Sequence, residues 1–164
     1  MRLCAIIPTY NNPQTIGEVV ARVREHIADV VVVDDGSTDA NKQVVRALRD
    51  AGSCQVVFRP QNGGKGAAVK SGLAWAHEHQ YDYALQIDAD LQHDPNDIPK
   101  LVAGVTGATD PTLVLAQPVF DASAPKGRLR ARKITVFFAK VETLSNKVGD
   151  PLCGYRVYPV EKAL

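Results

Sequence analysis

The chain has 164 residues, of which 45% are hydrophobic and 23% charged, and its net charge at pH 7 is +1. This composition is ordinary for one globular domain with a sizeable core, and the near-neutral charge gives no case for nucleic-acid binding. No apolar run approaches the roughly 18–20 residues of a membrane span, no signal peptide precedes the first strand pattern, and three widely spaced cysteines fit a reducing compartment. We therefore expect a cytoplasmic protein.

Short apolar runs alternate with helical patterns along most of the chain. The runs that predict strands are 3–7, 30–33, 55–58, 83–87 and 112–116. The segments that predict helices between them are 15–26, 39–51, 67–79 and 95–105, with Thr15, Asp39 and Asp94 as expected N-caps. This alternation predicts an α/β fold, a mostly parallel sheet with helices on both faces. Later patterns predict a helix over 134–144, a turn and strand over 150–158, and a helix that begins at Pro159.

The most informative stretch runs from Tyr83 to Pro95. A buried strand leads into Asp88, Asp90 and Gln92 at its carboxyl end, which is where open α/β sheets bind ligands. Two carboxylates one residue apart can share a hard cation, and the Gln92 amide adds a neutral oxygen. These residues therefore predict a Mg²⁺ or Mn²⁺ site that holds a substrate diphosphate. The plainer alternative is a solvated turn that caps the next helix.

A second polar cluster, Asp34-Asp35, follows the second predicted strand. A carboxylate there can accept a hydrogen bond from a base N–H or a ribose hydroxyl, or it can form an Asx turn that caps the next helix. Tyr10 can cover a base or ribose with its ring, or pack on the sheet end, and Asn12 is a weaker contact candidate. A parallel topology brings three such loops to one sheet edge: 8–13, 34–39 and 88–94.

Two basic segments are candidates for anion binding. In Asn62–Gly66, glycines precede a predicted helix and Lys65 adds charge, although the Walker pattern is absent; a tight turn with positive φ is the alternative. The group 126–133 contains Arg128 and Arg132. It is expected to be a solvated loop, a lid over phosphates or a patch for an anionic membrane surface.

Four motifs resemble the family 2 glycosyltransferases, and most closely the dolichyl-phosphate mannose synthase-like, or polyprenyl-phosphate glycosyltransferase-like, subgroup. The motifs are Ile6-Ile-Pro-Thr-Tyr-Asn11, Val32-Val-Asp-Asp-Gly-Ser-Thr-Asp39, Asn62-Gly-Gly-Lys-Gly-Ala67 and Gln86-Ile-Asp-Ala-Asp-Leu-Gln-His93. The turn Asp150-Pro-Leu-Cys-Gly-Tyr-Arg156 is similar to that subgroup's late Asp…Gly-Phe-Arg turn, with Tyr155 in place of Phe. The resemblance covers about residues 3 to 158.

The resemblance implies a GT-A fold, a nucleotide-sugar donor, a divalent metal and net inversion at the anomeric carbon. The residues that it places around the donor are Pro8, Tyr10 and Asp35 at the nucleotide, and Asp88, Ala89, Asp90 and Gln92 at the diphosphate and metal. Many relatives carry Glu where Asn12 stands. The family also continues past the position of Leu164, so we expect 1–164 to be a single GT-A domain that lacks its C-terminal end.

These inferences predict an inverting sugar transfer from a GDP- or UDP-sugar to an acceptor, foremost a polyprenyl phosphate. The metal is assigned to Asp90, assisted by Asp88 and Gln92, with Lys65 or an arginine of 128–132 adding positive charge. A phosphate acceptor is largely ionised near neutral pH, because its second pKa is about 6, and it needs no strong base. A hydroxyl acceptor would need one, for which Asp150 is the late candidate.

Two other classes compete with this prediction. A non-catalytic nucleotide-sugar-binding module would use the same donor residues without turnover. A sugar nucleotidyltransferase would carry a glycine-rich basic loop after the first strand, where this chain has Pro8-Thr-Tyr-Asn-Asn12. A dinucleotide-binding dehydrogenase is disfavoured because no Gly-X-Gly-X-X-Gly follows that strand.

Overall fold

The computed structural model describes residues 1–117 and 153–164. The chain divides into two compact units, one formed by residues 1–114 with 155–164 and the other by residues 115–154. Except at the boundary residue Leu115, the elements described below belong to the first unit. The predicted helix over 134–144 lies outside the described residues. The prediction of one domain over 1–164 that lacks its C-terminal end stays a prediction.

The first unit is built on a sheet with the strand order β3-β2-β1-β4-β6-β5. The strands are β1 (Leu3–Thr9), β2 (Val30–Asp34), β3 (Gln55–Phe58), β4 (Tyr83–Gln86), β5 (Val114–Leu115) and β6 (Arg156–Pro159). β1 pairs in parallel with β2 and β4, and β2 pairs in parallel with β3, whereas β6 runs antiparallel to β4. The predicted mostly parallel α/β sheet is therefore confirmed.

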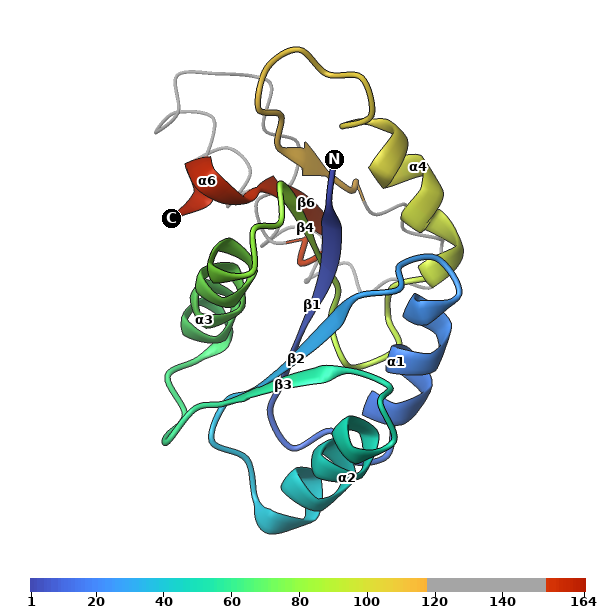
Figure 1. The fold of residues 1–164 in the computed structure, drawn as a ribbon. Coiled ribbons are helices and arrows are strands. Elements are labelled where there is room, and N and C mark those ends of the chain that lie inside the picture. Colours follow the sequence, from blue (N-terminus) through green and yellow to red (C-terminus); the bar gives the residue numbers. More distant parts are fainter. Residues whose placement is uncertain (118–152) are drawn as a thin grey trace, which may run out of the picture. The chain divides into compact units, whose positions relative to one another are not determined.

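Helices cover both faces of the sheet, as predicted. They are α1 (Ile16–Arg24), α2 (Asp39–Asp50), α3 (Lys65–Glu78), the 3₁₀ helix η1 (Pro95–Asp97), α4 (Ile98–Ala103) and α6 (Val160–Ala163). Figure 1 shows α3 and α6 on one face and α1, α2 and α4 on the other. Within 1–117 and 153–164, none of the helices has the length and apolar character needed to cross a bilayer.

Two element boundaries differ from the prediction for local reasons. β1 continues through Pro8 to Thr9 because β4 already ends opposite Ile6, so only β2 accompanies Pro8, which lacks an N–H. The predicted N-cap Asp39 is wrong: Thr38 occupies that position and Asp39 is the first residue of α2. A carboxylate there still lies close to the positive end of the helix dipole.

Two other helix starts show the effect of turn chemistry. α3 begins at Lys65, two residues earlier than predicted, because Gly64 adopts φ +85 and turns the chain directly into the helix. The predicted cap of the following helix is confirmed. The Asp94 side chain accepts a hydrogen bond from the Asn96 N–H, and Pro95 is the first residue of η1.

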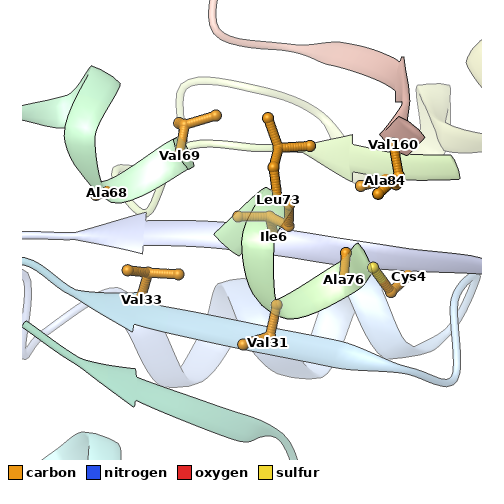
Figure 2. Close-up of a cluster of buried hydrophobic side chains, with 10 residues drawn as sticks. All are labelled: Cys4, Ile6, Val31, Val33, Ala68, Val69, Leu73, Ala76, Ala84 and Val160. Carbon is orange, nitrogen blue, oxygen red and sulfur yellow. The ribbon is translucent and has the colours of Figure 1, made fainter. Parts of the chain in front are cut away.

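An apolar cluster joins α3 to the sheet (Figure 2). Its buried members are Cys4, Ile6, Val31, Val33, Ala68, Val69, Leu73, Ala76, Ala84 and Val160. The helix packs closely because Gly72 faces the sheet, where a Cβ would lie 2.5 Å from Cγ2 of Ile6. Packing of α3 on β1 and β2 therefore fixes the position of Lys65, at the helix start, relative to the carboxyl ends of the strands.

Candidate functional site

A pocket of about 310 Å³ lies at the carboxyl ends of the first four strands, and we call it the edge pocket. Its lining residues are Pro8, Thr9, Tyr10, Asn12, Asp35, Asn62, Gly64, Lys65, Ala68, Asp88, Ala89 and Asp90. The three predicted loops do converge here, and the β3–α3 loop joins them. Among the described residues, all of the predicted site residues line the pocket except Gln92. Arg128, Arg132 and Asp150 lie outside the described residues.

A larger hollow of about 690 Å³ lies at the opposite end of β4, where Tyr83 begins the strand. Its lining comes from the end of α3 and the start of α6, together with Pro159. Ligands of open α/β sheets bind outside the carboxyl ends of the strands, so the smaller edge pocket is the better candidate.

The two adjacent carboxylates after β2 have different surroundings. Asp34 is fully buried and accepts hydrogen bonds from the Ser37 N–H (3.0 Å) and from Nδ2 of Asn41 (2.7 Å). It therefore forms the Asx turn that was the plainer alternative. Asp35 lines the edge pocket instead, so the functional alternative applies to this residue alone.

Asp35 is held by two donors from the β3–α3 side. Arg59 forms an ion pair with Oδ1, and the Gly63 N–H donates to Oδ1 at 3.1 Å and to Oδ2 at 3.3 Å. A carboxylate offers about four acceptor positions, so Asp35 retains acceptor capacity toward a ligand. Arg59 was not predicted as a site residue, because no recognised motif contains it.

Tyr10 and Asn12 form the opposite side of the edge pocket. The Tyr10 side chain is 49% exposed, so its ring is accessible to a ligand. The Asn12 side-chain oxygen accepts from the Tyr10 N–H at 3.3 Å, and the Asn12 N–H donates to Oδ1 of the buried Asn41 at 2.9 Å. Asn12 therefore shapes the turn that carries Tyr10.

Asp88 has the most unusual surroundings in the pocket. Its Oδ2 lies 2.5 Å from Nζ of Lys65 and 3.4 Å from Nε2 of His93, whereas Oδ1 is buried without a hydrogen-bond partner in the described structure. Burial alone would raise the pKa of Asp88. The hydrogen bonds and positive charge of His93 and Lys65 outweigh burial, and they lower the pKa from an ordinary 3.8 to about 2.

The turn after Asp88 positions the second carboxylate. Asp90 is exposed, and its Oδ1 accepts a hydrogen bond from the Gln92 N–H at 3.0 Å, while the exposed Gln92 side chain does not line the pocket. Between Asp88 and Asp90, the Ala89 carbonyl accepts a hydrogen bond from the Thr15 hydroxyl at 2.5 Å. Thr15 thus anchors the turn, although it makes no side-chain cap hydrogen bond to α1.

The donor set around Asp88 fits a hard divalent cation. The unpartnered oxygen of Asp88 and the exposed carboxylate of Asp90 are oxygen ligands of the kind that Mg²⁺ and Mn²⁺ prefer. No group of three His, Cys, Asp or Glu side chains suited to a metal occurs within 1–117 and 153–164. A cation here would therefore take further ligands from substrate oxygens or water.

His93 was missed as a site residue, because its spacing from the other histidines suggested no ligand set. In the structure its ring packs against Tyr155, with centroids 5.0 Å apart and an interplanar angle of 34°. The Tyr155 hydroxyl donates to the Asp94 carbonyl at 3.1 Å. Burial, with the nearby Asp97 and Asp94, raises the pKa of Tyr155, so this hydroxyl keeps its proton.

Comparisons with known proteins find relatives of this chain. The family described as Glycosyl transferase family 2 matches residues 4–163. An uncharacterised protein of Methanocaldococcus jannaschii is 31% identical over 171 residues, which cover 97% of this chain and 72% of the relative. The undecaprenyl-phosphate mannosyltransferase of Micrococcus luteus is 37% identical over 112 residues, which cover 66% of this chain and 46% of the relative.

Solved structures show the same fold. Glucosyl-3-phosphoglycerate synthase from Mycobacterium tuberculosis, in complex with Mn²⁺, UDP and glucosyl-3-phosphoglycerate, matches with a TM-score of 0.73 and 21% identity. The match covers 98% of this chain and 57% of the synthase. The predicted GT-A fold class is therefore confirmed. The chain spans about half the length of the synthase and of the mannosyltransferase.

Proposed function

The chain belongs to glycosyl transferase family 2, and from this membership and the edge pocket we propose a metal-dependent inverting transfer of a sugar from a nucleotide-sugar to a polyprenyl phosphate. One observation carries the proposal: Asp88 is held through one oxygen, its other oxygen is buried without a partner, and Asp90 lies beside it. That donor set suits a cation bound with a diphosphate.

Different residues of the pocket are assigned to different parts of the nucleotide-sugar donor. Tyr10 covers the base with its accessible ring, and Asp35 accepts a hydrogen bond from a base N–H or a ribose hydroxyl. Asp88 and Asp90, with Gln92 from the same turn, hold the cation. A bound divalent cation neutralises the charge that builds on the leaving diphosphate.

Lys65 adds positive charge on the diphosphate side. It is the first residue of the 14-residue helix α3, whose N-terminus carries unpaired N–H groups and a partial positive charge. Its ammonium pairs with Asp88 and is half exposed, so a phosphate oxygen can compete for it. Arg128 and Arg132 are proposed to contribute from outside the described residues.

The transfer is a displacement at the anomeric carbon. An oxygen of the acceptor phosphate forms the new bond to that carbon from the face opposite the leaving group. The bond from the carbon to the β-phosphate oxygen breaks, and its electron pair leaves with the nucleoside diphosphate. The acceptor oxygen is already ionised near neutral pH, so no strong base is required. With a hydroxyl acceptor, Asp150 would be the proposed base.

Two relatives support parts of this proposal. The name of the Micrococcus luteus enzyme states a polyprenyl-phosphate acceptor, undecaprenyl phosphate, and a mannosyl group. The synthase structure holds Mn²⁺ with UDP. The proposal covers a GDP- or UDP-sugar donor, Mg²⁺ or Mn²⁺ as the metal, and peripheral contact with a membrane.

Calorimetric titration of GDP and of UDP, each with and without Mn²⁺, tests the donor site. We expect one nucleotide to bind tightly only with the metal. Asp90→Ala should remove that binding with an unchanged melting temperature, because Asp90 is exposed. Metal-dependent binding that survives in Asp90→Ala would contradict the assignment.

A second measurement separates an enzyme from a binding module. Nucleoside diphosphate released from the nucleotide-sugar on addition of a polyprenyl phosphate supports transfer. Pyrophosphate released from a nucleoside triphosphate on addition of a sugar 1-phosphate would indicate a nucleotidyltransferase instead. Tight donor binding without any release would favour a non-catalytic module.

A further inference from the structure

Only one carboxylate oxygen of Asp88 contacts neighbouring side chains in the described structure. Lys65 and His93 both contact Oδ2, and Oδ1 has no partner within the described structure. A carboxylate held this way has a fixed orientation, and its other oxygen is left with an unmet capacity to accept a hydrogen bond or a cation. Outer residues that hydrogen-bond a metal-binding carboxylate typically change metal affinity 10- to 100-fold when mutated.

His93 is the more buried of the two residues that contact Asp88. Its side chain is 19% exposed, compared with 48% for Lys65, and its ring is rigid where the lysine stem has several rotatable bonds. His93 also has a support of its own, because its ring packs on Tyr155. The orientation of Asp88 therefore depends on what holds His93.

Tyr155 holds two consecutive residues of the loop that follows β4. Its ring contacts His93, and its hydroxyl donates to the Asp94 carbonyl at 3.1 Å. The side chain is almost fully buried and lies just before β6, which pairs with β4. Thr15 fastens the other end of the loop at the Ala89 carbonyl. The loop is thus anchored on both sides of its exposed turn.

We propose that Tyr155 and His93 form a positioning pair that orients the Asp88 carboxylate for its cation. This inference rests on the proposed function. Tyr155 acts through His93, and neither residue is assigned a contact with substrate. The tyrosine hydroxyl makes a contribution separable from that of the ring, since phenylalanine at this position would keep the ring contact and lose the hydrogen bond to Asp94.

The test is a calorimetric titration of Mn²⁺ in the presence of saturating UDP or GDP. We expect His93→Ala and Tyr155→Leu each to weaken Mn²⁺ binding by roughly 10- to 100-fold. His93→Gln keeps a side-chain donor and should retain more affinity than His93→Ala. Tyr155→Phe should lower Mn²⁺ affinity only about two- to fivefold. This variant still tests the inference if Tyr155→Leu does not fold.

The double variant His93→Ala/Tyr155→Leu tests the link between the two residues. If the Tyr155 ring acts through His93, the double variant should bind Mn²⁺ only about two- to fivefold more weakly than His93→Ala alone, which is the loss due to the hydroxyl, because coupled residues are not additive. Additive losses would overturn the inference, as would wild-type Mn²⁺ affinity in both His93→Ala and Tyr155→Phe.

Tyr158→Phe is the matched control. It removes a tyrosine hydroxyl bonded to Oε1 of Gln86 at 3.0 Å, in β6 and away from the loop. We expect a small fall in melting temperature and unchanged Mn²⁺ affinity. If Tyr158→Phe weakened Mn²⁺ binding as much as Tyr155→Phe, general destabilisation would explain both, and the inference would fall. If the wild-type protein bound neither UDP nor GDP in the presence of Mn²⁺, the proposed function would be wrong, and this inference with it.

Discussion

The two sides of the edge pocket differ in how completely folding satisfies their polar groups. On the first side, which we call the Tyr10 wall (residues 8–12 and 34–41), Asp34, Asn41 and Asn12 bond to one another or to nearby backbone. On the second, which we call the Asp88 wall (residues 88–94 with Lys65), a buried oxygen of Asp88 has no partner in the described structure.

This difference separates a preformed surface from one that a ligand completes. A buried acceptor without a partner is destabilising, by about 1–3 kcal/mol, and more if it is charged. The Tyr10 wall avoids this cost through its own hydrogen bonds, so mutations of the residues that shape it, such as Gly36 and Asp34, should act mainly on stability. Under the proposed function a cation would give this oxygen of the Asp88 wall a partner, so mutations of Asp88 and Asp90 should act mainly on ligand affinity.

The largest expected effect comes from breaking the Tyr10 wall at Gly36. This residue has φ +69, and a Cβ would lie 2.5 Å from backbone atoms of Gln61 and Asn62. Gly36→Ala should therefore lower the free energy of unfolding by about 3 kcal/mol or more, from left-handed strain together with the backbone clash. Thermal unfolding followed by circular dichroism would show a fall of about 6–12 °C.

Gly52→Ala is the control for the strain alone. Gly52 has nearly the same φ, +70, but nothing lies within 4 Å of its added Cβ. Its loss should be about 1 kcal/mol. Equal losses at the two glycines would mean that contact with the Gln61–Asn62 backbone does not stabilise the pocket.

A smaller effect should distinguish the two adjacent carboxylates. Asp34 receives its donors on separate oxygens, Ser37 N–H on Oδ1 and Asn41 Nδ2 on Oδ2. An asparagine there must turn its NH₂ toward a donor, and Asn41 cannot flip in response because its oxygen accepts from Asn12. Asp34→Asn should thus lower the free energy of unfolding by about 2 kcal/mol.

Asp35→Asn provides the comparison. Both Arg59 and the Gly63 N–H contact Oδ1 of Asp35, so an asparagine can present one oxygen to both. We expect a loss of stability below about 1 kcal/mol, with weaker nucleotide binding instead. Chemical denaturation and calorimetry of both variants measure the two effects. Equal destabilisation would show that the two carboxylates have the same structural role.

Local patterns predicted much of the fold. The runs at 30–33 and 55–58 match β2 and β3 closely, and the Asp94 cap was found, because neighbouring residues determine these features. The position of β6 between β4 and β5 was not predicted, since its pairing with β4 joins residues 70 to 76 positions apart in the chain. Periodicity carries no information on such pairing.

The site was predicted less completely for the same reason. Motifs and the parallel topology brought Tyr10, Asp35 and Asp88 to one edge. The family resemblance assigned Asp35, and not Asp34, to the nucleotide, but the two residues alone did not distinguish their roles. Only the three-dimensional packing places His93 beside Asp88. Neighbouring side chains in one turn point in different directions, and the order of residues in the sequence does not determine those directions.

A further effect of small size concerns the pH dependence that Lys65 gives to the Asp88 wall. The folded pKa of Asp88 is depressed to about 2, so its contribution to stability is full above the ordinary value of 3.8 and is lost as pH falls toward 2. Lys65→Met should raise this pKa and lower the free energy of unfolding by about 1 kcal/mol at pH 6. This figure is discounted because Lys65 is half exposed and shares Asp88 with His93.

Urea unfolding at several pH values, with EDTA present, measures this loss. The difference between wild type and Lys65→Met should shrink between pH 4 and pH 2, as Asp88 takes up a proton in both proteins. Lys70→Met, which removes an exposed lysine from the same helix, controls for the change in net charge. A difference that stays constant over this range, or that Lys70→Met reproduces, would show that Lys65 does not stabilise the ionised form of Asp88. The Asp88 carboxylate would then depend on His93 alone among its two described donors.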